Sequence, residues 1–128
     1  RKKIEAGADF ALTQPVFDPA IARRFTQTYA ERYGPLALPV LVGLMPLYNA
    51  RHARFLHHEV PGIQIPDAIM ARVEAAGDAT EEGGMGISIA CEIVDGLKAI
   101  PEVRGLYVMP QFGRYNLAAE IIDCVSEK

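Results

Sequence analysis

Three short apolar stretches alternate with segments of helical spacing, and this order constrains the fold more than any other feature of the sequence. The stretches are residues 10–13, 38–44 and 103–109. The second stretch does not alternate apolar with polar residues, which is typical of a parallel strand that is covered on both faces. Strands that alternate with helices predict parallel βα units joined by right-handed crossovers. We therefore expect an α/β fold.

A clear helix signal follows the first predicted strand. Asp18 is a good N-cap, and Pro19 occupies the first helical position. Ile21, Phe25 and Tyr29 then repeat at a spacing of four, which marks one apolar helical face. The next glycine and proline, at positions 34 and 35, predict the end of this helix.

The remaining pattern fits a part of a larger barrel. Residues 1–6 are typical of a helix end closed by Gly7, Asn49 caps a predicted helix that continues to residue 58, and further helices are predicted at 66–76, 82–98 and 115–125. Three strands cannot close a barrel, whereas eight βα units form a (βα)8 barrel of about 250 residues. Residues 1–128 are therefore expected to be one domain that corresponds to part of such a barrel.

Composition excludes several classes of protein. Half of the 128 residues are hydrophobic and the net charge is −3, which excludes a disordered chain and argues against a nucleic-acid platform. The apolar stretches are too short to span a membrane, and residues 1–6 do not lead into the apolar run of a signal peptide. Cys91 and Cys124 are too few for a disulfide scaffold and form no metal motif. We expect a reducing, cytoplasmic setting.

Candidate binding residues lie at the strand exits, where barrels of this kind carry their chemistry. Gln14 follows the first strand, and its amide can both donate to and accept from a heteroaromatic edge; a bond to backbone is the alternative. Arg114 follows the third strand and can grip a carboxylate or phosphate, or form a surface ion pair. His52 lies near the second exit, where it can bond a ligand or remain a polar surface residue.

The sequence offers no catalytic set of its own. Paired carboxylates, a Ser–His–Asp arrangement and a Cys–His arrangement are not visible at the strand exits. The histidines at 52, 57 and 58 lack zinc spacing, so no metal site is expected. The GGMG run at 83–86 lacks the spacing of a phosphate loop and favours close helix packing or a helix-start turn. Lys2 and Lys3 lie at a helix end, where cations suit the helix dipole.

Four segments together resemble the methylenetetrahydrofolate reductase family. KIEAGADFALTQPVFD at 3–18 resembles the region of its sixth barrel strand, and VGLMP at 42–46 resembles the seventh. IQIP at 63–66 resembles the step that follows, and LYVMPQFGR at 106–114 resembles the eighth. YNARHARFLHHEVPG at 48–62 further resembles bacterial proteins that fuse this reductase to a homocysteine methyltransferase. The resemblance covers nearly the whole chain and implies the C-terminal portion, about strands six to eight, of a (βα)8 barrel.

The resemblance also implies an activity and roles for individual residues. Family members pass hydride from NAD(P)H to FAD and then to 5,10-methylenetetrahydrofolate, which gives 5-methyltetrahydrofolate. Gln14, His52, Leu56 and Arg114 match positions near the folate substrate, although His52 stands where the family often has glutamine and Leu56 where some members have phenylalanine. Lys2 and Lys3 match a basic pair at the phosphate and ribose end of FAD.

The family's catalytic glutamate, the aspartate that tunes its flavin and most of its FAD site belong to strands one to five, which this sequence does not contain. We therefore expect that this chain contributes no catalytic residue and does not catalyse the reaction alone. The expected partners are the folate substrate, the nicotinamide dinucleotide and the missing N-terminal half of the barrel, and three parallel strands with open edges favour self-association. The alternatives are another flavin- or phosphate-binding barrel, or a non-catalytic half-barrel that pairs with another chain.

Overall fold

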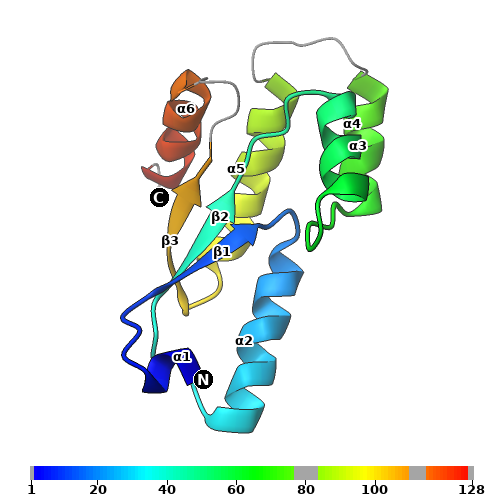
Figure 1. The fold of residues 1–128 in the computed structure, drawn as a ribbon. Helices are drawn as coiled ribbons and strands as arrows, with labels where there is room; N and C mark the ends of the chain where they lie inside the picture. The colour runs from blue at the N-terminus through cyan, green and yellow to red at the C-terminus, as the bar shows by residue number, and fades with distance from the viewer. Residues whose placement is uncertain (1, 77–83, 110–114, 127–128) are drawn as a thin grey trace.

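The computed structural model describes residues 2–76, 84–109 and 115–126, which form a three-stranded parallel sheet and six helices (Figure 1). The elements follow in the order α1 (Lys2–Glu5), β1 (Ala11–Pro15), α2 (Pro19–Tyr33), β2 (Val40–Leu44), α3 (Ala50–Glu59), α4 (Asp67–Ala76), α5 (Gly84–Lys98), β3 (Val103–Val108) and α6 (Tyr115–Ser126). This order confirms the predicted α/β fold with parallel strands. The cap signals also hold: Asp18 accepts a hydrogen bond from the Ala20 amide, and Asn49 accepts one from the His52 amide.

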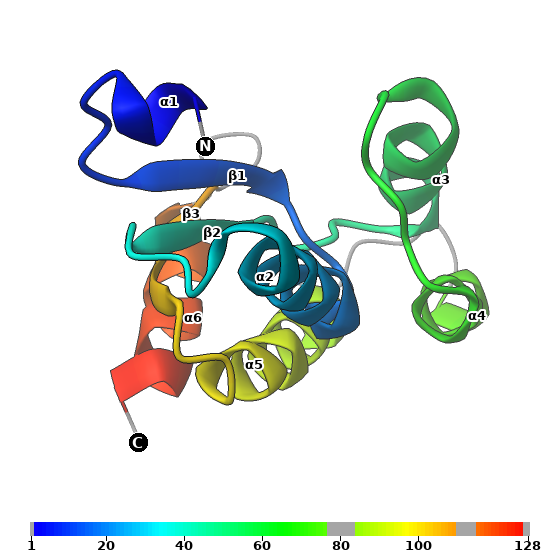
Figure 2. The same ribbon diagram turned by 90° about the horizontal axis from the view of Figure 1, so that it is seen from below.

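The strands lie side by side in chain order, β1–β2–β3. Figure 2 shows α2, α5 and α6 along one face of this sheet, while α3 and α4 form a separate pair beside it. An ion pair joins Arg54 on α3 to Glu74 on α4, and a second joins Arg72 on α4 to Glu92 on α5. The helical pair is therefore tied to the helices that cover the sheet.

The core lies between the sheet and the helices. Val40, Val42 and Leu44 on β2 are buried, as are apolar residues along α5. Apolar side chains on the central strand and the facing helix are removed from water together, and this burial is the main stabilising contribution to the fold. The core side chains include Phe17, Val42, Leu44, Ile89, Ile93, Val94, Leu97 and Ile121.

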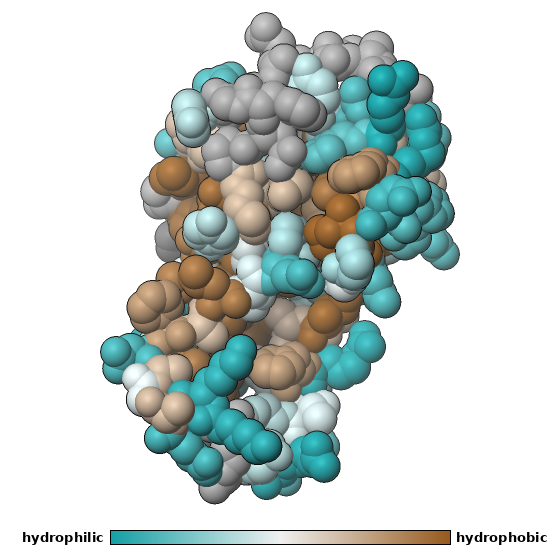
Figure 3. All heavy atoms as spheres, in the orientation of Figure 1, coloured by the Kyte–Doolittle hydropathy of each residue, from teal (hydrophilic) through white to brown (hydrophobic). Residues whose placement is uncertain are grey.

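In the described part of the chain, the opposite face of the sheet carries none of the longer helices, and only the short helix α1 lies on that side, near the start of β1 (Figure 2). Leu12 on β1 is 53% exposed and Tyr107 on β3 is 46% exposed. In the view of Figure 3, hydrophobic side chains gather over the strands on this face. A parallel sheet is ordinarily covered on both faces, so an apolar face this open is unusual for a parallel sheet.

Two elements differ from the sequence pattern. The apolar stripe on α2 is exposed, with Ile21 at 38% and Phe25 at 58%, while Thr26 is the buried residue of that helix. β1 continues to Pro15, two residues beyond the predicted stretch at 10–13. Proline keeps its carbonyl group, and a strand can include it as a terminal residue at an edge.

A disulfide joins Cys91 on α5 to Cys124 on α6, with a Cα–Cα distance of 5.8 Å. The cysteine count favoured reduced thiols, so this bond is a correction to that expectation. Cysteines 33 residues apart meet here because α5 and α6 pack side by side on the sheet. Within the described ranges, no helix has the length and apolar character needed to cross a membrane.

Candidate functional site

The carboxyl ends of the three strands meet at one edge of the sheet, because the strands are parallel. β1 ends at Pro15, β2 at Leu44 and β3 at Val108. The loop after β2 leads directly into α3, which places this helix at the same end of the molecule (Figure 1). Gln14 on β1 and His52 on α3 therefore lie on elements that leave the sheet at one edge, as the sequence predicted.

An irregularity at the end of β1 fixes the backbone of Gln14. The β1–β2 register shifts between Leu12 and Pro15, which is a bulge-like feature. The Thr13 hydroxyl accepts a hydrogen bond from the Gly43 amide at 2.8 Å and donates one to the Gln14 carbonyl at 2.7 Å. The Val16 amide then donates to the Gly43 carbonyl at 3.0 Å. Hydrogen bonds from Gly43 to Thr13 and from Val16 to Gly43 thus hold the chain on both sides of Gln14.

Gly43 permits this close approach because it has no side chain. A Cβ atom at this position would lie 2.7 Å from the Thr13 carbonyl oxygen, 2.9 Å from the Gln14 carbonyl oxygen and 2.8 Å from Cε of Met109. Backbone atoms cannot give way as a flexible side chain can. The close packing of β1 on β2 therefore explains why the VGLMP segment has glycine at this position.

The Gln14 side chain is exposed at the strand exit and lies against a turn between α3 and α4. Gly62 in this turn has a φ of +85°, and a Cβ atom on it would be 2.5 Å from Oε1 of Gln14. The same amide borders an apolar groove of about 300 Å³ between β1 and α2, which Phe25 and Val42 help to line. No motif in the sequence marks Gly62 as part of a site, although the Pro61-Gly62 pair is a recognised turn signal.

His52 has a local structural role. Its Nδ1 accepts a hydrogen bond from the Tyr48 amide at 3.0 Å, while its own amide donates to Asn49 at the helix start. Burial lowers the pKa of the His52 imidazole below its ordinary value of 6.5. The ring is therefore neutral at pH 7, and its Nδ1 secures the loop between β2 and α3. Its contact with folate stays a prediction.

Leu56 and Phe55 occupy opposite environments on α3. Leu56 is buried in the core at 5% exposure, whereas Phe55 is 55% exposed. The apolar residue that matches the family position therefore packs inward, and the neighbouring aromatic ring faces solvent. The role of Leu56 at the substrate also stays a prediction.

The histidines that follow on α3 do not form a metal site. Nδ1 of His57 accepts a hydrogen bond from the Ile65 amide at 3.1 Å, and the rings of His57 and His58 meet edge to face. Within residues 2–76, 84–109 and 115–126, no cluster of three or more His, Cys, Asp or Glu residues could hold a metal ion. Through its hydrogen bond with Ile65, His57 instead links α3 to the segment between α3 and α4.

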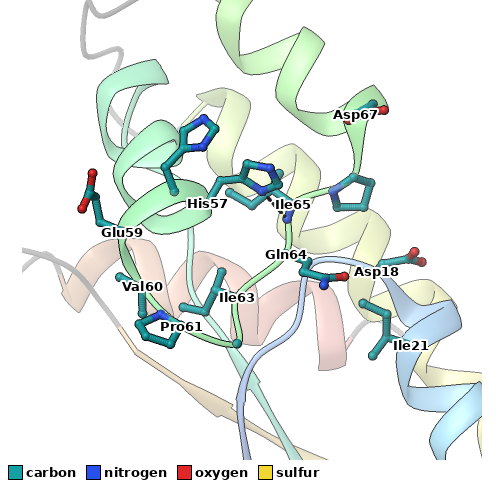
Figure 4. A pocket seen from close by; sticks show the side chains of 13 residues that line it. Asp18, Ile21, His57, Glu59, Val60, Pro61, Ile63, Gln64, Ile65 and Asp67 are labelled. Carbon is teal, nitrogen blue, oxygen red and sulfur yellow. Dashed lines mark hydrogen bonds between the residues drawn. The ribbon is translucent and has the colours of Figure 1, made fainter.

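A cavity of about 640 Å³ lies along that segment (Figure 4). Figure 4 shows Asp18, Ile21 and Gln64 on one side of it, with Glu59 and Pro61 on the other. Gly62 borders both this cavity and the apolar groove beside Gln14. Ile21 and Gln64 also border both, so the cavity and the groove lie next to each other at this turn.

Lys2 and Lys3 are exposed on the short helix α1, which lies beside the amino-terminal end of β1 in Figure 1, whereas Gln14 lies at the other end of that strand. Arg114 lies outside the described residues. The groove beside Gln14 is apolar, and the two ammonium groups are not part of it. The assignment of Lys2 and Lys3 to FAD stays a prediction.

Comparison with known proteins agrees with the fold and with the motifs. A model of the family described as methylenetetrahydrofolate reductase matches residues 1–124. A similar solved structure is that of an uncharacterized protein from Clostridium thermocellum that binds two copies of 5-methyl-5,6,7,8-tetrahydrofolic acid, with a TM-score of 0.68 and 18% sequence identity. The likeness covers 98% of this chain and 45% of that one, so the chain spans less than half the length of its structural relative. At this identity the likeness shows the fold, whereas the family match extends over nearly every residue, and the chain belongs to the methylenetetrahydrofolate reductase family.

Proposed function

We propose that this chain is the C-terminal part, about strands six to eight, of a (βα)8 methylenetetrahydrofolate reductase. The complete cytoplasmic enzyme would move hydride from NAD(P)H through FAD to 5,10-methylenetetrahydrofolate and produce 5-methyltetrahydrofolate. The observation that carries this proposal is the bare apolar face of the parallel sheet, with Leu12 and Tyr107 exposed on it, in a chain of this family. In a closed barrel, side chains on that face would fill the interior.

Both flanks of the sheet support the same interpretation. Beside β1, the groove of about 300 Å³ is lined by apolar residues that include Phe25 and Val40. Beside β3, a groove of about 540 Å³ is lined by residues that include Leu106 and Ile122. In a (βα)8 barrel each strand is paired on both sides and each helix packs against the next one. Two apolar flanks and a bare face are what neighbouring βα units would cover.

The proposed division of labour follows from the side chains at hand. The Gln14 amide would read the mixed donors and acceptors of the pterin ring, and His52, Leu56 and Arg114 would complete the folate side. Lys2 and Lys3 would face the phosphate and ribose end of FAD, most of which would be held by segments outside this chain. The catalytic acid would also come from those segments. The folate ligand of the structural relative supports a folate substrate.

An activity assay tests this division directly. The 128-residue chain and a complete protein that carries it are each supplied with FAD, and NAD(P)H oxidation is followed with menadione and, separately, with 5,10-methylenetetrahydrofolate as acceptor. We expect turnover by the complete protein and none by the chain alone. Turnover by the chain alone would disprove the proposed division, and a complete protein that does not reduce methylenetetrahydrofolate would disprove the function.

Self-association is a second property that the open edges favour. An isolated chain with unpaired strand edges and a bare apolar face would gain by pairing with a second copy. Light scattering coupled to size exclusion gives the mass in solution. We expect a mass greater than 14.0 kDa for the chain alone, and a stable monomer would count against this interpretation.

A further inference from the structure

We propose that Gly62 is a positioning residue for Gln14: the turn between α3 and α4 sets where the Gln14 amide stands at the exit of β1. This inference rests on the proposed function, because it gives Gly62 a role through the folate contact of Gln14. The two residues are 48 positions apart in the sequence, and they meet because α3 leads the chain back to the end of β1.

The contact is close and directional. A Cβ atom at position 62 would lie 2.5 Å from Oε1 of Gln14, 3.5 Å from Cδ and 3.8 Å from Nε2. The oxygen end of the amide therefore rests in the space that a side chain at position 62 would take. The amino end lies farther from this space than the oxygen end does.

The backbone on the Gln14 side cannot move to relieve a clash. The Thr13 hydroxyl links the Gly43 amide to the Gln14 carbonyl, and the Val16 amide returns to the Gly43 carbonyl. These bonds hold the main chain on both sides of Gln14. A larger residue at position 62 would therefore move the glutamine side chain rather than its strand.

The turn on the other side is held as well. The Ile63 amide donates to the Val60 carbonyl at 3.4 Å, and a φ of +85° at Gly62 after Pro61 is typical of a type II turn. The Ile65 amide donates to His57, and Ile63 and Ile65 are both buried. The turn is thus anchored in the core immediately after Gly62 and has little freedom to withdraw.

The test is a double-mutant cycle in the complete protein, with Gly62→Ala, Gln14→Ala and both changes together. If Gly62 acts through Gln14, Gly62→Ala should raise the folate KM by roughly threefold to tenfold, about the loss of one hydrogen bond. The double variant should then have the folate KM of Gln14→Ala, because the two changes remove the same contact. Additive effects would overturn the inference.

A control separates the contact from backbone strain. Gly34 also has a positive φ, +82°, but nothing lies within 4 Å of the Cβ that an alanine would add there. Gly34→Ala should therefore destabilise the protein by strain alone and leave the folate KM unchanged. If Gly34→Ala raises the folate KM as much as Gly62→Ala does, a positioning role for Gly62 is wrong.

The outcome remains informative if Gly62→Ala does not fold. In that case the clash with Gln14 should be relieved by Gln14→Ala, and the double variant should regain a cooperative unfolding transition. A double variant that stays unfolded would show that backbone strain at the positive φ of Gly62, and not its contact with Gln14, determines the effect, and would overturn the inference. If Gln14→Ala by itself leaves folate kinetics unchanged, the proposed function of Gln14 fails, and this result is distinct from an additive cycle.

Discussion

The Thr13 hydroxyl oxygen accepts a hydrogen bond of 2.8 Å from the Gly43 amide, at the point where the register of β1 on β2 shifts. It takes the place of a backbone carbonyl group. A side chain thereby satisfies a strand amide, and the same oxygen donates to the Gln14 carbonyl. Backbone amides that lie inside a sheet need a partner, because an unsatisfied donor away from water is costly. Thr13 thus joins the stability of the sheet to the placement of the candidate folate contact.

Thr13→Val should lower the free energy of unfolding by about 1–3 kcal/mol, since it leaves the Gly43 amide without its acceptor while it preserves side-chain volume. Urea denaturation followed by circular dichroism measures this change. Thr28→Val, on the exposed surface of α2, is the matched control and should change the stability by less than about 0.5 kcal/mol. If both substitutions lower the free energy of unfolding equally, the structural role of Thr13 is wrong.

Phe25→Ser distinguishes an unpartnered helix face from one that is covered in a larger barrel. Because Phe25 is exposed in this structure, the substitution should change the stability of the 128-residue chain by less than about 0.5 kcal/mol. In a complete barrel the neighbouring unit would bury the ring, and the same change should cost about 3 kcal/mol or more. Thermal unfolding of both forms gives the comparison.

Phe17→Ala provides the control for this experiment, because Phe17 is fully buried by residues of this chain. It should cost about 3–5 kcal/mol in either form. A large effect of Phe25→Ser on the isolated chain, or none on the complete protein, would contradict the proposed packing of a further βα unit against α2.

The sequence predicted the elements well because their signals are local. Asp18 and Pro19 begin α2, Gly34 ends it with a positive φ, and Asn49 begins α3, each through bonds within a few residues. Strand exits could also be predicted, since parallel strands end at one edge. These local rules placed Gln14 and His52 at the same end of the sheet.

Other features depend on contacts that local patterns do not reveal. The spacing of Ile21 and Phe25 marks a helical face, but whether that face is buried depends on tertiary contacts, and both residues are exposed in the structure. Leu56 and Phe55 both suit an apolar contact, and only the packing of α3 shows which one points inward. Gly62 was missed because its importance comes from Gln14, far away in the sequence.

The disulfide between Cys91 and Cys124 should stabilise the packing of α6 on α5. For a loop closed by cysteines 33 residues apart, the chain-entropy estimate is about 3–4 kcal/mol. The oxidised chain should therefore unfold at a higher urea concentration than the same chain under reductant, and a thiol-alkylating reagent should label neither cysteine before reduction. A reducing cytoplasm would favour the dithiol and remove this stabilisation.

The variant with both Cys91→Ser and Cys124→Ser is the control for the reductant. Its unfolding midpoint should match that of the reduced chain and should not respond to reductant. Rapid alkylation of both cysteines in the untreated chain would show that the bond does not form, and equal midpoints with and without reductant would show that it does not stabilise the fold.

His52 should make the stability depend on pH. Its pKa is lowered in the folded chain, so between the folded and unfolded pKa values the unfolded state binds more protons. The contribution of His52 to the free energy of unfolding is then greatest above about pH 6.5 and falls as the pH decreases below that value. The hydrogen bond adds a reason, because Nδ1 accepts from the Tyr48 amide only while it is unprotonated.

Urea midpoints at pH 7.5 and 5.5 measure the change, with His52→Asn as a variant whose side-chain oxygen can replace the acceptor without titrating. The His52→Asn chain should lose less stability on acidification than the original, whereas His58→Asn, at an exposed position on the same helix, should lose as much as the original. An identical loss in the original chain and in His52→Asn would show that protonation of His52 does not destabilise the loop before α3.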